Sequence, residues 1–344
     1  MTLPTKWPEP LKAPLANAFY GGALGDALGF LVELQRPEEI ATFAHRLAGN
    51  KEGCLPWLKN LQPQDWLTHA VYPSGQVSDD TQLTHLLMHA LAEGDAHGYN
   101  TVFRANLAQA FANGNIYSYG HTTKKAAEQY MHSTTTPQGS ISSTSNGSVM
   151  RIVPIGIYFS ADLNTVATQA YTHSQETHAH PAPCTAAQAQ ALAAALLVQS
   201  KQVITLHEKQ KFVEKIALHL THTPSQNLYL NLIKLIQMPL EEAKACILTL
   251  DAQQGATHQN GGISMDAVIG TLWAHVCFLN SPREYWQTLT NALSIGGDVD
   301  TVAAMAGALS GLYNSHSAFP SWYKDWLKFK GSLSFSVDPA SKTS

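Results

Sequence analysis

The sequence is poor in charge, and neither sign predominates strongly. Only 13% of its 344 residues are charged, and the formal net charge is −4. Such a chain has no basic field to attract nucleic acid or an anionic membrane surface, so we expect neither as a partner. Apolar residues make up 44% of the chain, which is enough for a deep core in one large domain or two smaller ones.

Cysteine and long apolar runs are also scarce. The four cysteines are scattered and form no CxxC pair, so we interpret them as reduced thiols of a cytoplasmic protein. Delivery to another cell by a non-classical route stays open. The longest apolar stretch, 191–198, is too short to cross a bilayer, and the first residues contain no apolar run of signal-peptide length. We also expect a monomer.

Strand patterns are nearly absent, whereas apolar residues recur at helical spacing along most of the chain. The segment 152–159 is rich in β-branched and aromatic residues, yet Pro154 and Gly156 argue against a central strand. We predict an all-α protein of roughly a dozen helices, with one compact domain over 15–330 and flexible ends at 1–14 and 331–344. The predicted helices are 16–34, 81–93, 101–114, 122–132, 163–171, 183–201, 209–221, 227–237, 240–250, 265–279, 282–293 and 301–315.

Small residues are spaced regularly in two of these predicted helices. They recur every four positions in two series, Gly21, Gly25 and Gly29 near one end of the chain and Ala303, Gly307 and Gly311 near the other. Small side chains at this spacing form a flat stripe, which lets two helices approach closely. Glycine inside a helix costs about 1 kcal/mol relative to alanine. Close packing around a site offsets that cost, and simple tolerance in a large core is the alternative.

Two short acidic clusters stand about 220 residues apart, each at the predicted start of a helix. They are formed by Ser78, Asp79, Asp80 and Thr81 and by Asp298, Asp300 and Thr301. Separate helix caps are one reading of these residues, but a cap needs a single acid. In addition, Gly296 and Gly297 allow a tight backbone turn ahead of the second cluster. Brought together, the clusters offer the oxygen ligands that one or two hard divalent cations require.

Two further acids lie among apolar and small residues of the segment 16–34. Asp26 follows a glycine of the first stripe, and Glu33 lies four residues beyond its last glycine, on the same helix face. Acids in such surroundings are expected to be buried and either paired or bound to a ligand.

A third candidate element is the turn formed by Asn146, Gly147 and Ser148, which leads into an apolar segment. Its backbone N–H groups suit a phosphate. The nearby Arg151 can pair with a phosphate or hold the loop to a buried acid. A plain turn is the alternative.

Histidines gather at the loop 177–181. His173, His178, His180 and Cys184 together suggest zinc, but their spacing fits no standard zinc motif. We instead expect a loop that turns one histidine toward a ligand.

These segments carry a resemblance to a known family. The sequences GALGDALGFLVE (22–33), SDDTQ (78–82), SNGSVMR (145–151), THAHP (177–181) and SIGGDVDTVAAMAGALSGLY (294–313) follow one another in the family's order over about 290 residues. The chain resembles the ADP-ribosylglycohydrolases, the group of dinitrogenase-reductase-activating and ADP-ribosylarginine hydrolases. The resemblance implies a compact all-α fold with two Mg²⁺ or Mn²⁺ ions.

The resemblance also implies roles for individual residues. The metal ligands would be Ser78, Asp79, Asp80, Asp298, Asp300 and Thr301, with Asp300 as the bridge and Ser78 standing where many members have threonine. The catalytic residues would be Glu33, Asp79 and Asp80. The substrate would be bound by Asn146, Gly147, Ser148, His178 and Gly297.

The function implied is metal-dependent removal of ADP-ribose from a modified protein side chain, for which ADP-ribosylarginine is our first choice. The partners are then an ADP-ribosylated protein and the product ADP-ribose. Serine-linked or smaller substrates, a non-catalytic ADP-ribose-binding or inhibitory module, and a metal-dependent phosphohydrolase are the alternatives. Either Glu33 or a metal-bound aspartate would be the general base. The acceptor would be recognised by loops such as 55–74 and 252–262.

Overall fold

A computed structural model describes residues 2–49, 73–133, 139–255 and 260–329. These ranges contain helices, turns and isolated bridges but no β-strand, which confirms the all-α prediction. Most of the predicted loop 55–74, and residues 256–259 of the loop 252–262, lie outside the described residues. The same holds for the predicted flexible end 331–344.

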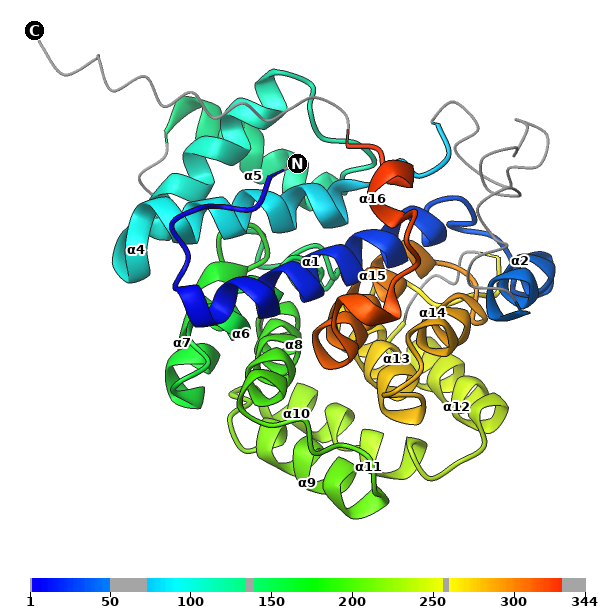
Figure 1. The fold of residues 1–344 in the computed structure, drawn as a ribbon. Coiled ribbons are helices and arrows are strands. Elements are labelled where there is room, and N and C mark those ends of the chain that lie inside the picture. The colour runs from blue at the N-terminus through cyan, green and yellow to red at the C-terminus, as the bar shows by residue number, and fades with distance from the viewer. Residues whose placement is uncertain (1, 50–72, 134–138, 256–259, 330–344) are drawn as a thin grey trace, which may run out of the picture.

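The helices follow one another as shown in Figure 1. They are α1 (Glu9–Gly29), α2 (Pro37–Gly49), α4 (Asp79–Ala112), α5 (His121–His132), α6 (Val153–Tyr158), α7 (Leu163–Ser174), α8 (Pro181–Gln199), α9 (Leu206–Ala217), α10 (Thr223–Tyr229), α11 (Leu232–Leu235), α12 (Leu240–Gln253), α13 (Ala267–Asn280), α14 (Tyr285–Leu293), α15 (Val299–Asn314), the 3₁₀ turn η2 (His316–Ala318) and α16 (Tyr323–Trp326).

The centre of the core is made by α8 and α13. Residues 183–197 of α8 and 267–279 of α13 are all buried, as expected for helices that are apolar on every face. Within the described residues, α8 alone has the length and composition to cross a membrane, and 89% of its apolar window is buried inside the protein. Cys184 and Cys277 lie in these two helices as free, buried thiols.

The two small-residue stripes face each other where α1 crosses α15 (Figure 1). A Cβ added to Gly21 would lie 2.9 Å from the Cα of Gly311, and one added to Gly29 would lie 2.6 Å from the backbone nitrogen of Asp300. Real Cβ atoms do not approach backbone so closely. The close helix contact predicted from the spacing is therefore confirmed, and it places Asp300 against the end of α1.

Helix α4 unites two predicted helices, 81–93 and 101–114. The interruption expected between them is a bend: a Cβ on Gly94 would lie 2.6 Å from the Cα of Tyr99, a residue five positions further along. Tyr99 is buried, and its ring lies 5.9 Å from that of His173. Tertiary packing thus continues the helix through two glycines that weaken it locally.

Several predicted boundaries were wrong. Helix α1 begins at Glu9 rather than at residue 16, and the buried Trp7 donates from its indole nitrogen to the carbonyl of Met88 at 3.0 Å. The flexibility of residues 1–14 stays a prediction. The same helix ends at Gly29 rather than at residue 34. Glu33 therefore lies in the turn that follows and does not continue a helix face. Helices α2 and α16 were not predicted, and the predicted helix 227–237 is divided into α10 and α11. The assignment of 15–330 to one domain stays a prediction.

Candidate functional site

Asp26 organises the first acidic cluster. Its carboxylate accepts hydrogen bonds from the backbone N–H of Ser78 (3.0 Å) and from the backbone N–H (3.1 Å) and hydroxyl (2.5 Å) of Thr81. These donors belong to the N-terminus of α4, where backbone N–H groups have no helical partner and an anion is favoured. Asp26 thereby fixes the first turn of α4, which carries Asp79 and Asp80.

A diglycine turn shapes the second cluster. Gly296 and Gly297 have φ values of 72° and 78°, in the left-handed region. Gly297 donates its N–H to the carbonyl of Gln35 (2.9 Å) and accepts at its own carbonyl from Leu34 (2.7 Å). The turn thus joins the segment that carries Glu33 to the start of α15. Gly297 is predicted to bind substrate, and its N–H is used for this internal bond.

The two halves of the site meet at Asp300. Ligand oxygens of Asp26, Asp80 and Asp300 lie within 4.8 Å of one another, and so do those of Glu33, Asp298 and Asp300. All five side chains are at least 94% buried. The folding of the chain therefore brings the predicted clusters together, and Asp300 belongs to both groups. Its role as a metal bridge stays a prediction.

Three other predicted ligands surround these groups. The hydroxyl of Ser78 donates to Asp80 at 2.7 Å, and that of Thr301 lies 3.5 Å from the same carboxylate. Asp79 is a member of neither carboxylate group, although the charges of Asp26, Glu33 and Asp298 act on it. Ser78 and Thr301 thus lie beside the cluster with a hydroxyl available, while Asp79 stands at its edge.

Burial and mutual repulsion disfavour ionisation across the cluster. Burial raises the pKa of Asp298 to about 7, and burial together with the neighbouring carboxylates raises the pKa values of Asp79, Asp80 and Asp300 well above their usual range. Burial also raises the pKa of Asp26 to about 6, although its hydrogen bonds oppose the change. A group of acids in this state calls for a positive counter-charge.

The donor set fits divalent cations. Among the residues that the structure describes, one oxygen of Asp80 and one of Asp300 are buried and have no hydrogen-bond partner, which is costly for a carboxylate unless a ligand satisfies it. All donors are oxygens, the type that Mg²⁺ and Mn²⁺ prefer. Each of the two overlapping carboxylate groups has the set of oxygen donors that a metal ion would need.

The Asn146 loop is fastened directly to this cluster. The side-chain amide of Asn146 donates to Asp298 at 2.5 Å, and the buried hydroxyl of Ser148 is paired with that of Ser174 at 2.7 Å. Both side chains are thus engaged within the protein. Any phosphate cradle here must be made by backbone N–H groups around Gly147, with Asn146 orienting an acid of the cluster.

Arg151 holds the loop rather than a buried acid. It is fully buried and donates to the carbonyl of Gly147 (2.6 Å), to the hydroxyl of Thr177 (2.7 Å) and to Nε2 of His173 (3.2 Å). Because arginine has no acceptor, His173 must accept at Nε2 and carry its proton on Nδ1, toward Asn100. His173 is therefore part of the scaffold, which argues against the zinc alternative.

His178 lies directly behind the loop. Its Nδ1 pairs with the hydroxyl of Thr177 (2.8 Å) and its Nε2 with that of Ser145 (3.0 Å). Burial, with Arg151 adding to the effect, lowers the pKa of His178 to about 3, so the ring is neutral. A Cβ on Gly147 would meet this ring at 2.9 Å. His178 therefore packs against the loop and supports it. Its partner Ser145 borders the open cavity beside Asp298.

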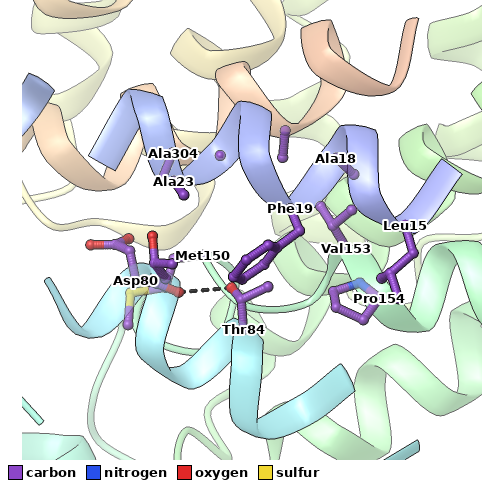
Figure 2. Close-up of a pocket in the computed structure, with 13 residues that line it drawn as sticks. Leu15, Ala18, Phe19, Ala23, Asp80, Thr84, Met150, Val153, Pro154 and Ala304 are labelled. Atoms are coloured by element: carbon purple, nitrogen blue, oxygen red, sulfur yellow. Dashed lines mark hydrogen bonds between the residues drawn. The ribbon is translucent and has the colours of Figure 1, made fainter. Parts of the chain in front are cut away.

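Two cavities adjoin the cluster. Figure 2 shows the first, an apolar space of about 20 Å³ between α1, α4 and α6 with Asp80 at one end and Phe19 and Val153 at its sides. The second, of about 290 Å³, is open and is bordered by Asp298, Ser145 and residues 263–266. The second cavity is open and reaches Asp298, so it gives a ligand access to the cluster.

Comparison with known proteins identifies relatives over nearly the whole chain. The sequence model of the family described as ADP-ribosylglycohydrolase matches residues 9–334. An ADP-ribosylarginine hydrolase of Serratia proteamaculans is 23% identical, over 90% of this chain and 73% of its own length. The ADP-ribosyl-dinitrogen reductase glycohydrolase of Rhodospirillum rubrum is 30% identical, over 48% of this chain and 51% of its own. A solved structure named as an ADP-ribosylglycohydrolase-related protein complex superposes with a TM-score of 0.63, at 20% identity and with 93% of both chains covered.

Proposed function

The chain belongs to the ADP-ribosylglycohydrolase family, hydrolases of the glycosidic linkages of ADP-ribose, and from this premise we propose that it releases ADP-ribose from modified arginine side chains of a protein, using two divalent cations. The observation that carries the proposal is the convergence of four buried acids, Asp26, Glu33, Asp80 and Asp298, on a fifth, Asp300. Buried carboxylates without compensating charge destabilise a folded protein, and bound divalent cations would compensate their charge.

The cations would be held by Ser78, Asp79, Asp80, Asp298, Asp300 and Thr301. When bound, Mg²⁺ or Mn²⁺ supplies Lewis acidity toward sugar hydroxyls and water and compensates the charge of the acids.

The chain's own residues do the remaining work. Backbone N–H groups around Gly147 bind the diphosphate. Because the diphosphate does not react itself, its binding energy serves to position C1″ of the ribose. Asn146 holds the Asp298 carboxylate in one orientation through its 2.5 Å hydrogen bond. Buried carboxylates stabilise positive charge that develops on the ribose as the acceptor leaves. Glu33 or an aspartate of the cluster accepts the proton of the attacking water.

Support for arginine as the acceptor comes from the relative that is named an ADP-ribosylarginine hydrolase and aligns with 90% of this chain. The acidic surroundings of the site are also compatible with a cationic guanidinium leaving group. The arginine assignment rests on these two points.

A substrate panel tests the proposal. Proteins or peptides carrying ADP-ribose on arginine or serine, and ADP-ribosylated nucleic acid, are incubated with the enzyme and Mg²⁺, with and without EDTA, and released ADP-ribose is measured. We expect release from arginine, its loss in EDTA, and its loss in Asp300→Ala. The exposed acid Asp162, which caps α7, gives the control Asp162→Asn. Release by Asp300→Ala at the wild-type rate would refute the metal-dependent mechanism, and preference for the serine linkage would refute the acceptor.

A further inference from the structure

We infer that Asp251, a buried acid of α12, is a positioning residue for both halves of the site. It acts through the segment 260–267, called the strap here, which passes between the diglycine turn and the Asn146 loop. The inference rests on the proposed function for its catalytic consequences, but its structural basis is independent of the substrate.

One edge of the strap holds the diglycine turn. Ile263 donates its N–H to the carbonyl of Gly296 at 3.0 Å, and its carbonyl accepts from the N–H of Asp298 at 3.2 Å. Further along, the side-chain amide of Asn260 donates to the carbonyl of Leu34 at 2.8 Å. This edge therefore sets the backbone of Asp298 and the turn that carries Glu33.

The other edge of the strap holds the Asn146 loop. The N–H of Asn146 donates to the carbonyl of Met265 at 3.0 Å, and the N–H of Ala267 donates to the carbonyl of Thr144 at 2.9 Å. The loop that binds Asp298 through the Asn146 amide is thus attached to the same strap that binds Asp298 through its backbone. The relative position of these two residues depends on where the strap lies.

Asp251 anchors the middle of the strap. One carboxylate oxygen accepts the backbone N–H of Ser264 at 2.8 Å, and the other accepts the Ser264 hydroxyl at 2.6 Å. The hydroxyl in turn accepts the N–H of Asp266 at 3.1 Å. Asp251 is completely buried and Ser264 nearly so, and both oxygens of the acid are directed to one residue of the strap. Charge-assisted bonds of this kind are about twice as strong as neutral ones.

The geometry distinguishes this acid from an ordinary core residue. Asp251 binds Ser264 through both carboxylate oxygens, and Ser264 lies in the strap between Ile263, which binds Asp298, and Met265, which binds Asn146. Loss of the anchor frees the strap to move away from α12. Asp298 and Asn146 then lose their common support, so cation affinity and substrate binding fall together.

The test compares Asp251→Asn and Ser264→Ala with the wild type and with the control Asp162→Asn. Binding of Mn²⁺ and of ADP-ribose is measured by titration calorimetry on the intact protein, kcat and KM are measured with the preferred substrate, and Tm is measured without metal. We expect both variants to bind Mn²⁺ about 10-fold more weakly, as is typical when residues supporting a metal site are removed. We also expect a raised KM, and a double variant no worse than Asp251→Asn, because both substitutions break one interaction.

A lowered Tm with wild-type Mn²⁺ affinity, kcat and KM would overturn the inference, since Asp251 would then be only a core residue. If Asp251→Asn fails to fold, Ser264→Ala still decides the question, because it removes the hydroxyl bond and keeps the carboxylate. Failure of the proposed function is separate: a wild type that hydrolyses no ADP-ribose linkage leaves the Mn²⁺ comparison intact.

Discussion

Alanine at Gly25 tests whether close helix packing holds the site together. Its Cβ would lie within 3.0 Å of three backbone atoms of Ala303 and Ala304 on α15, so no side-chain rotation can relieve the contact. Overpacking of this kind costs about 1–3 kcal/mol. The higher helix propensity of alanine than of glycine offsets about 1 kcal/mol of this cost. Because the neighbours are backbone, the cost lies at the upper end, and we expect a net loss of about 2 kcal/mol in the free energy of unfolding.

The matched control is Gly98→Ala in α4, where an added Cβ meets no atom of the described residues within 4 Å. This variant should be more stable than the wild type by about 0.5–1 kcal/mol. Urea unfolding in EDTA measures both changes without the metal, and Mn²⁺ titration then follows the site. In Gly25→Ala the displaced α15 carries Asp300 with it, so Mn²⁺ affinity should also fall. A Gly25→Ala protein as stable as Gly98→Ala would refute the packing argument.

Three further results are expected. Asp26→Asn replaces one acceptor oxygen by a donor facing the N–H groups of α4, so unfolding should become easier by about 2 kcal/mol in urea, and unchanged stability would contradict its organising role. His275 is fully buried, and burial lowers its pKa to about 3. Between pH 6.5 and about 3, this imidazole is therefore protonated in the unfolded chain but stays neutral in the folded chain. The wild type should therefore lose about 2 kcal/mol more than His275→Gln between pH 6.5 and 4.5, and equal losses would exclude this titration. Arg104→Met leaves Glu176 buried without its bidentate partner and should cost about 3–5 kcal/mol, whereas adding Glu176→Gln should recover part of the loss.

Local patterns predicted most of the helices and the residue types that gather at the site. The small-residue stripes of α1 and α15 could be found because a four-residue spacing is a property of one helix. The acidic clusters could be found because each begins a helix and has more acids than a cap needs. Their convergence on Asp300 could be anticipated only through the resemblance to a family, because a separation of about 220 residues has no local signature.

Other features depend on tertiary structure and were not predictable in this way. The glycine spacing predicts Glu33 on a helix face, but α1 ends at Gly29, where it meets the first turn of α15. Asp251 was overlooked because an acid in an amphipathic helix normally faces solvent, and its partner Ser264 is 13 residues away in a polar loop. Helix α2 did carry a signal in its N-terminal Pro37 and the two glutamates that follow, which are typical of a helix start.

The contact between α1 and α15 also limits when the site can form during synthesis of the chain. Gly25 and Ala303 are 278 positions apart, and a ribosome adds about 5–20 residues per second, so α1 waits roughly 15–60 s for its partner to be made. During that time the flat glycine surface and the acids beside it have no α15 to cover them. The carboxylate cluster that we propose to hold cations includes Asp300 of α15, so it cannot be complete in any nascent chain that lacks α15.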